Sequence, residues 1–194
     1  MTDLGIELLP LSEIDLELVR NWRNSPSVSQ YMYTNEYISP EQQQNWFKKV
    51  SSDDSQKYWI VLFQGKKVGL VSIYSINQRF KWCHWGFYLG EEQERGQKIG
   101  SKVECFFLEY LFNTLHFNRV IGEVFALNSK GVAFHEKFGF RREGYFRQHI
   151  LKDGIYHDVV AIALLKNEWN LLREHNFKWA FSTSSSESDL NTET

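Results

Sequence analysis

The segment over residues 82–102 limits the possible folds of this chain more than any other. An apolar run over residues 82–89 predicts a strand, and apolar side chains recur at helical spacing over residues 98–113. The connection between them is short and carries glycines. The first backbone N–H groups of a helix have no intrahelical partner, so a strand that enters a helix through such a turn can bind an anion. The segment therefore predicts a strand–turn–helix crossover with a phosphate site.

The remaining patterns predict further strands and helices. Capping boxes at Ser12 and Ser39 begin two helices, and Asp153-Gly154 predicts a hairpin turn. Strands are expected over residues 58–63, 68–74, 119–127, 143–151 and 155–165, and further helices over 129–137 and 166–174. This order implies an α/β (α+β) fold. Its sheet is mixed and mostly antiparallel, with one βαβ crossover through the long helix and with flanking helices.

One domain is expected over residues 1–179, followed by a disordered tail over residues 180–194. The 194 residues suffice for one hydrophobic core without disulfides or a structural metal. Ser, Thr, Asn and acidic residues make up nearly all of the tail. Because such a composition buries too little apolar surface to offset its conformational entropy, we expect the tail to be disordered.

Charge and cysteine usage argue against several classes of protein. The formal net charge is −2 and no basic cluster occurs, so neither nucleic acid nor a membrane surface is an expected partner. No apolar segment is long enough to span a bilayer and no leader pattern opens the chain, so a cytoplasmic location is expected. We interpret Cys83 and Cys105 as buried thiols. The six histidines lack metal-ligand spacing, so no metal is expected.

The loop before the long helix resembles the pyrophosphate-binding loop of the GNAT acetyltransferase superfamily, which reads Arg/Gln-x-x-Gly-x-Gly/Ala. Arg95 and Gly100 match the ends of this motif, whereas Lys98 stands at its inner glycine. We expect Lys98 to reduce the backbone freedom of the turn and to add a second cation beside the phosphates. Residues 128–140 also resemble the family, and the whole resemblance covers residues 8–169.

The resemblance implies the GNAT fold with acetyl-CoA as the acetyl donor. In that fold the fourth and fifth strands splay apart, here at residues 87–89 and 124–126. Pantetheine then lies in the gap and bonds to the exposed backbone like an added strand. The residues assigned to acetyl-CoA are Phe87, Tyr88, Leu89, Arg95, Gly96, Gln97, Lys98, Ile99, Gly100, Ser101, Asn128 and His135.

The resemblance also implies direct transfer, in which the amine attacks the thioester in a ternary complex. A backbone N–H near Tyr88 would polarise the thioester carbonyl. Glu123 and His84 are candidates for the general base, acting through water, provided that each lies on the cleft face of its strand. His135 stands where many family members carry a Tyr that protonates the thiolate. It is either this general acid or a surface-facing helix residue.

Within the superfamily, the chain resembles the nucleotide-sugar N-acetyltransferases of pseudaminic acid biosynthesis, which acetylate a UDP-linked 4-amino-4,6-dideoxy sugar. The resemblance rests on residues 20–24, 31–32, 38–46 and 147–158. It implies a UDP-amino sugar as acceptor, bound by Arg20, Arg23, Met32, Trp46 and His149. Two different functions are also compatible with the sequence: an N-terminal acetyltransferase of the ribosomal-protein type, and a non-catalytic CoA-binding regulator. A homodimer is compatible with the sequence, which does not determine the oligomeric state.

Overall fold

A computed structural model of the chain describes residues 5–91 and 98–182, with a seven-stranded sheet at the centre. The strand order is β1-β2-β3-β4-β5-β7-β6, and all neighbours are antiparallel except β4 and β5. The strands are β1 (Ile6–Pro10), β2 (Lys57–Phe63), β3 (Lys66–Asn77), β4 (Trp82–Leu89), β5 (Arg119–Phe125), β6 (Arg141–Lys152) and β7 (Ile155–Leu165). The predicted α/β class, with its mostly antiparallel sheet and single crossover, is confirmed.

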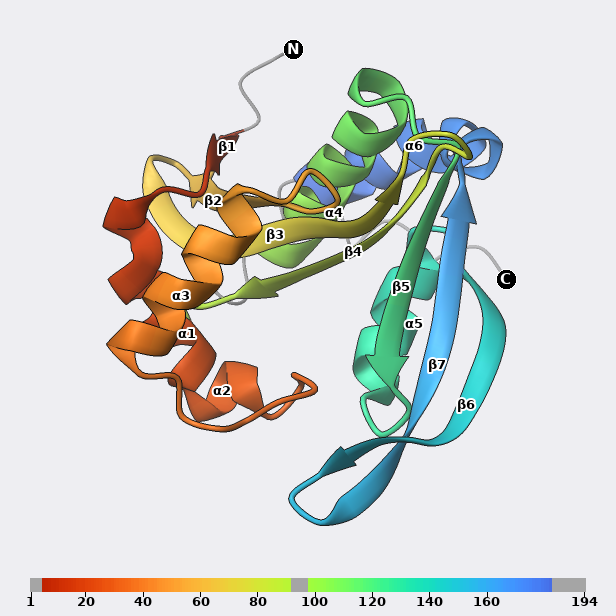
Figure 1. The fold of residues 1–194 in the computed structure, drawn as a ribbon. Coiled ribbons are helices and arrows are strands. Elements are labelled where there is room, and N and C mark those ends of the chain that lie inside the picture. Colours follow the sequence, from red (N-terminus) through yellow and green to blue (C-terminus); the bar gives the residue numbers. More distant parts are fainter. Residues whose placement is uncertain (1–4, 92–97, 183–194) are drawn as a thin grey trace.

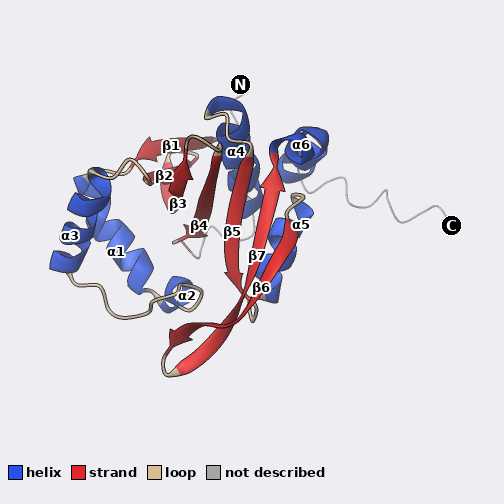
Figure 2. Cartoon of the chain, turned by 45° about the vertical axis from the view of Figure 1, so that its right-hand side comes forward, coloured by secondary structure: helices blue, strands red, loops and turns tan. Residues whose placement is uncertain are grey.

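Helices cover both faces of this sheet (Figures 1 and 2). They are α1 (Leu16–Asn24), α2 (Pro26–Ser29), α3 (Pro40–Ser51), α4 (Ile99–Glu109), α5 (Ser129–Lys137) and α6 (Lys166–Phe181). A 3-10 turn, η1 (Glu13–Asp15), precedes α1, and a π-helical turn, η3 (Tyr110–Thr114), extends α4. The crossover from β4 to β5 runs through α4 and η3, so the expected βαβ unit is present.

The sheet separates a large core from a small one. The large core joins the sheet to α4, α5 and α6 and includes Trp85, Phe107 and Trp169, all of them buried. The small core joins α1 to the other face and includes Trp22 and Leu70. Any ligand that contacts both faces must therefore pass through the sheet or around its edge.

Local signals explain most of the element boundaries. The Ser39 hydroxyl accepts a hydrogen bond from the Gln42 backbone N–H at 3.2 Å, and the Gln42 side chain accepts one from the Ser39 N–H at 2.8 Å. This capping box begins α3 as predicted. Gly139 has φ +101°, which suits a glycine directly after α5.

Two helices differ from their predicted bounds. The last helix was expected to end near Glu174, but α6 continues to Phe181 because Ala180 is fully buried and Phe181 packs on the large core. At the other end of the chain, the capping box at Ser12 begins η1 rather than α1. Ile14 therefore lies outside α1, and 84% of it is exposed.

Candidate active site

A gap in the sheet between β4 and β5 is the central feature of the site. These two strands pair only at Trp82 with Arg119, Cys83 with Val120 and His84 with Ile121. Beyond His84 the strands separate, as the ribbon in Figure 1 shows. The predicted splay over residues 87–89 and 124–126 is confirmed. The facing edges of both strands thus offer backbone groups that no neighbouring strand pairs, as an extended pantetheine chain requires.

A cavity of about 780 Å³ opens at this gap and is lined from both faces of the sheet. Side chains alternate along a strand, so neighbouring residues of β4 point to opposite faces. Trp85 and Phe87 join the large core near α5, whereas Tyr88 joins the small core beneath α1. The cavity therefore connects a chamber under α1 to α3 with the face that carries α5.

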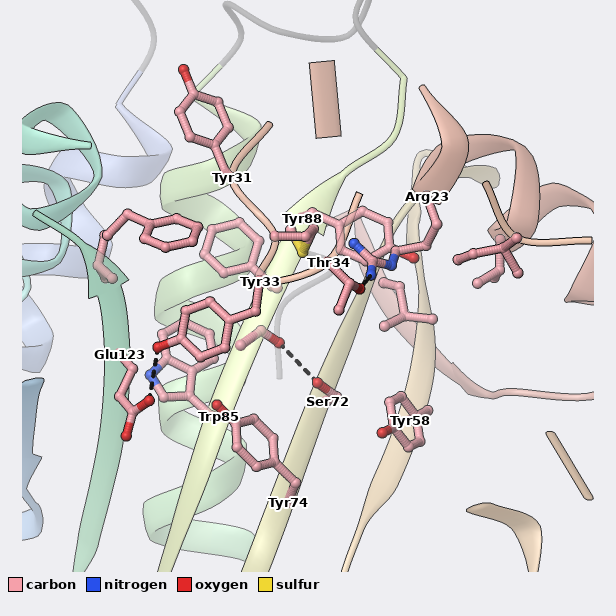
Figure 3. A pocket seen from close by; sticks show the side chains of 18 of the residues that line it. Arg23, Tyr31, Tyr33, Thr34, Tyr58, Ser72, Tyr74, Trp85, Tyr88 and Glu123 are labelled. Atoms are coloured by element: carbon pink, nitrogen blue, oxygen red, sulfur yellow. Dashed lines mark hydrogen bonds between the residues drawn. The ribbon is translucent and has the colours of Figure 1, made fainter. Parts of the chain in front are cut away.

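Tyrosines dominate the wall of the chamber beneath α1 to α3 (Figure 3). The loop over residues 31–38 closes one side, and alternate residues of β2 and β3 form the floor. The lining residues of this chamber include Arg23, Tyr31, Met32, Tyr33, Thr34, Glu36, Tyr37, Trp46, Tyr58, Ser72, Tyr74 and Glu123. Such a wall offers aromatic faces and hydroxyl groups to an acceptor molecule.

Glu123 lies in this chamber and is held by a tyrosine. The Tyr33 hydroxyl donates a hydrogen bond of 2.8 Å to a Glu123 carboxylate oxygen, and the Tyr33 ring packs edge-on against Phe125. Burial, together with the nearby Glu123 carboxylate, raises the pKa of Tyr33. Tyr33 therefore stays protonated and remains a hydrogen-bond donor. Glu123 lies on the cleft face of its strand, as a general base requires.

His84 lies on the same face but does not line the cavity. Its ring packs between Tyr74, at 5.4 Å between centroids, and Trp82, at 6.0 Å. Burial lowers the pKa of His84, the Glu123 carboxylate opposes this effect, and Arg119 reinforces it. Burial also raises the pKa of Tyr74 to about 12. His84 is thus a neighbour of the chamber, separated from it by Tyr74.

Arg23 carries an unpaired donor into the chamber wall. Its Nη1 atom is buried and makes no hydrogen bond to the described residues, while Nη2 lies 3.5 Å from the Thr34 hydroxyl. Burial lowers the pKa of Arg23, and Tyr88 opposes this effect. Arg20 differs, because it donates to Glu17 at 2.8 Å and to Tyr37 at 3.1 Å and does not line the cavity. Arg20 supports the wall, whereas Arg23 belongs to it.

His135 lines the cavity from α5 and contacts a carboxyl that the sequence analysis did not identify. Its Nδ1 lies 3.1 Å from Oε1 of Glu104 on α4. Glu104 is fully buried, and burial raises the pKa of its carboxyl against the opposing effect of His135. The interpretation of His135 as a surface-facing helix residue is wrong, since only 15% of its side chain is exposed.

The start of α4 has the features of an anion site. The first intrahelical bond of α4 runs from the Lys102 N–H to the Lys98 carbonyl, so the N–H groups of residues 99–101 have no partner within the helix. Lys98 adopts a left-handed φ of 55°, the conformation that the family motif gives to glycine. Its ammonium lies 5.4 Å from the ring of Trp179 on α6. A role for Lys98 beside a phosphate stays a prediction.

The structure brings together half of the predicted site residues that lie in the described part of the chain. Arg23, Met32, Trp46, Phe87, Tyr88, Glu123, Asn128 and His135 line the cavity. Arg20, His84, Leu89, Lys98, Ile99, Gly100, Ser101 and His149 do not. Ile99 and Ser101 are buried in α4, so only their backbone can face a ligand, and His149 is exposed on β6. Arg95, Gly96 and Gln97 lie outside the described residues.

Sequence reasoning missed the tyrosines of the chamber and the buried Glu104. The sequence did contain a pattern that indicates the tyrosines. Tyr58 on β2 and Ser72 and Tyr74 on β3 occur at positions that share one face of the sheet. Glu104 had one too, since it interrupts the apolar run of its helix. Asn128, which was predicted, accepts a hydrogen bond from the Gly131 N–H at 3.0 Å and caps α5.

The described residues contain neither a group of metal ligands nor a helix suited to a membrane. Within residues 5–91 and 98–182, no group of three or more His, Cys, Asp or Glu side chains could hold a metal ion. None of the helices in the same part of the chain is long and apolar enough to cross a membrane.

Comparison with known proteins shows that the chain is similar to acetyltransferases. Residues 6–141 match the family described as "Acetyltransferase (GNAT) domain". Spermidine N(1)-acetyltransferase of Escherichia coli K12 is 24% identical over 171 residues, which cover 88% of this chain and 90% of that protein. Acetyltransferase PseH of Campylobacter jejuni is 28% identical over 131 residues, covering 67% and 79%. The structure of Vibrio cholerae spermidine N-acetyltransferase with CoA and spermine has a TM-score of 0.79 at 22% identity, covering 86% and 98%.

Proposed function

This chain belongs to the GNAT acetyltransferase family, and we propose that it acetylates the 4-amino group of a UDP-linked 4-amino-4,6-dideoxy sugar. It is an acetyl-CoA-dependent N-acetyltransferase, as its family membership implies. The acceptor is the proposed part. One observation carries it: the cavity wall contains an arginine, Arg23, with a buried and unpaired Nη1.

An arginine in this state needs an oxygen-rich partner. Burying a charged group without a partner is costly, and the guanidinium fork matches phosphate and carboxylate oxygens well. The diphosphate of a UDP-sugar provides such oxygens, whereas a polyamine adds only positive charge near Arg23. The aromatic side chains Tyr31, Tyr37 and Trp46 suit the faces of a sugar ring and a uracil.

Three groups of the chain carry out the transfer in this proposal. Glu123 removes a proton from the acceptor ammonium, directly or through one water, and Tyr33 fixes the carboxylate for this task. A backbone N–H of β4 near Tyr88 stabilises the negative charge on the thioester oxygen. His135 supplies the proton to the departing sulfur. The base and the acid thus lie on opposite faces of the sheet, at the gap between β4 and β5.

The relatives support two different acceptors. PseH of Campylobacter jejuni is compatible with the sugar. The spermidine acetyltransferase of Escherichia coli covers more of the chain and favours a polyamine as the second candidate. Glu36 and Glu123, both in the cavity wall, are the groups that would bind polyamine ammonium ions. The third candidate is an N-terminal protein acetyltransferase, whereas a non-catalytic CoA-binding regulator does not agree with the family membership.

An acceptor screen tests the proposal. Wild type is incubated with acetyl-CoA and a UDP-4-amino sugar, spermidine or a ribosomal-protein N-terminal peptide, and thiol release is followed. Cys83 and Cys105 are buried, so the protein adds little to the thiol signal. We expect the highest kcat/KM with the sugar. A higher kcat/KM with spermidine or with the peptide would contradict the sugar assignment.

The variant Arg23→Met separates the two main candidates. It should lower kcat/KM for the sugar about 10- to 100-fold, as expected for a lost hydrogen bond to a charged group. Arg79→Met, an exposed arginine outside the cavity, is the matched control. If wild type and Arg23→Met both prefer spermidine to the sugar, the sugar assignment is wrong.

A further inference from the structure

We propose that Glu104 is a positioning residue that orients His135 and keeps it protonated for transfer to the departing CoA sulfur. This inference rests on the proposed role of His135 and adds a residue that neither the loop motif nor the cavity lining identifies. Glu104 comes from α4 and His135 from α5, two helices on the same face of the sheet. The 3.1 Å contact between them is the only hydrogen bond of either side chain among the described residues.

Burial of Glu104 is difficult to explain by stability alone. The residue is 0% exposed, and its second carboxylate oxygen, Oε2, has no hydrogen-bond partner within residues 5–91 and 98–182. A buried ion pair seldom stabilises a fold more than apolar residues of the same volume, because both groups lose their hydration. An unsatisfied buried oxygen adds a further cost. A group kept at such a cost is a candidate for a functional role.

The environment limits what Glu104 can do. Besides His135, the titratable group electrostatically coupled to it is Cys105, whose own thiol is buried and whose pKa burial raises. Aromatic rings surround the imidazole: Trp85, Phe134 and Phe140 have centroids within 5.6 Å of the His135 ring. Glu104 is therefore the partner that can stabilise a positive charge on His135 in this apolar setting.

The contact also determines which nitrogen can donate. Because Nδ1 faces Glu104, Nε2 is the ring atom left for a ligand in the cavity, and it makes no hydrogen bond to the described residues. In this proposal the acid form of the pair has one proton on Nε2 and one between Nδ1 and the Glu104 carboxyl. The second proton can reside on either partner, and burial raises the pKa of Glu104.

The transfer step conserves protons and electrons. The amine nitrogen, freed of one proton by the base, attacks the thioester carbon and forms the new C–N bond. It then loses its second proton to water to become the amide nitrogen, and the C–S bond breaks with its electron pair on sulfur. Nε2 of His135 gives its proton to that sulfur, which leaves as the CoA thiol. His135 remains with the Nδ1 proton shared with Glu104, and solvent restores the proton on Nε2.

The first test needs no substrate. Histidine-labelled free protein is studied by ¹⁵N NMR, and the His135 signals are assigned from their loss in His135→Phe. In wild type we expect a protonated Nδ1 bonded to Glu104. Glu104→Leu should move the Nδ1 resonance, whereas Glu109→Gln, on the same helix but bonded to Trp169 and Arg173, should not. Identical His135 signals in Glu104→Leu and wild type would overturn the proposal.

The second test measures single-turnover thiol release with whichever amine the enzyme accepts. The isosteric Glu104→Gln should slow release about 10- to 100-fold, the range typical when a residue that orients a histidine is lost. It should add no further loss in a His135→Phe background, because the two residues act as one unit. Losses that multiply, or a Glu104→Gln rate equal to wild type, would refute the proposal.

A selenium analogue distinguishes acid catalysis from folding. A selenolate leaves without a proton more readily than a thiolate, so acetyl-seleno-CoA should largely restore the rates of Glu104→Gln and His135→Phe. A defect that persists with the selenoester would show that Glu104 is only structural. If the sugar is inactive but another amine turns over, the acceptor proposal fails, and this comparison is made with that amine.

Discussion

The Tyr33 hydroxyl donates a 2.8 Å hydrogen bond to the Glu123 carboxylate, although 90 positions separate the two residues in the sequence. Tyr33 belongs to the loop after α2, and Glu123 lies on β5 beside the gap in the sheet. The bond therefore joins the wall of the acceptor chamber to the strand that borders the donor. It keeps one carboxylate oxygen occupied and leaves the other for a substrate proton.

Replacing the proposed base should have a large effect. We expect Glu123→Gln to lower kcat about 10²- to 10⁴-fold, the range typical of general acid–base catalysis, with the acetyl-CoA Kd unchanged. Tyr33→Phe removes only the hydrogen bond that fixes the carboxylate, so its loss of kcat should be smaller. Steady-state kinetics and calorimetric titration measure the two quantities. If Glu123→Gln keeps wild-type kcat, another group or water is the base.

The glycine at the start of α4 offers a separate test of donor binding. A methyl group at Gly100 would meet protein atoms no closer than 3.7 Å, so packing does not require glycine there. Gly100→Ala should therefore fold, with a melting temperature equal to or above that of wild type, because alanine is the better helix former. If phosphates approach this backbone, the methyl group should weaken the acetyl-CoA Kd at least about tenfold. An unchanged Kd would exclude close approach at Gly100.

Lys152 should affect acceptor binding although it does not line the acceptor chamber. Its ammonium is buried and donates to the carbonyls of Ser29, Gln30 and Met32 at 2.8, 3.0 and 2.9 Å. These bonds tie the loop that carries the chamber wall to the end of β6. Lys152→Met leaves three carbonyls without this donor. It should raise the acceptor KM about tenfold and lower stability by about 2 kcal/mol.

Lys152→Met should not change the binding of acetyl-CoA. The acetyl-CoA Kd of Lys152→Met should match wild type, because the side-chain hydrogen bonds of Lys152 among the described residues go to Ser29, Gln30 and Met32, on the acceptor side of the cavity. Lys57→Met, at the exposed start of β2, is the matched control. An acceptor KM that stays at the wild-type value would mean that the loop holds its place without Lys152.

The sequence predicted the helices and strands well because the signals that begin and end them are local. The capping box at Ser39 and the strand over residues 82–89 depend on neighbouring residues, and both are confirmed. The end of α6 was wrong, since burial of Ala180 depends on contacts with distant parts of the chain. The tail was expected to begin at residue 180, whereas Ala180 and Phe181 belong to α6.

The candidate site was harder to predict for the same reason. His84 pairs with Ile121, two positions before Glu123 on the same strand, yet only Glu123 lines the cavity, because Tyr74 packs over the His84 ring. The contact between Glu104 and His135 joins two helices, and no spacing rule relates them. Such contacts follow from tertiary packing alone, so they become visible only in the folded chain.

The half-buried His84 should make stability depend on pH. Burial lowers its pKa below the ordinary 6.5, so the unfolded chain binds this proton more tightly than the folded one. The free energy of unfolding therefore falls as the pH drops below about 6.5, and the fall stops once the folded His84 is protonated too. For one proton the slope cannot exceed about 1.4 kcal/mol per pH unit.

His84→Phe removes this proton and keeps a ring between Tyr74 and Trp82. Its stability relative to wild type should therefore improve as the pH falls from 7 to 5, because only wild type carries the penalty of a buried imidazole. Urea unfolding across that range measures the difference, with His175→Phe, an exposed histidine on α6, as the control. A difference between His84→Phe and wild type that stays constant with pH would mean that His84 titrates alike in the folded and unfolded chains. The Glu123 carboxylate would then fully offset the effect of burial on the His84 pKa.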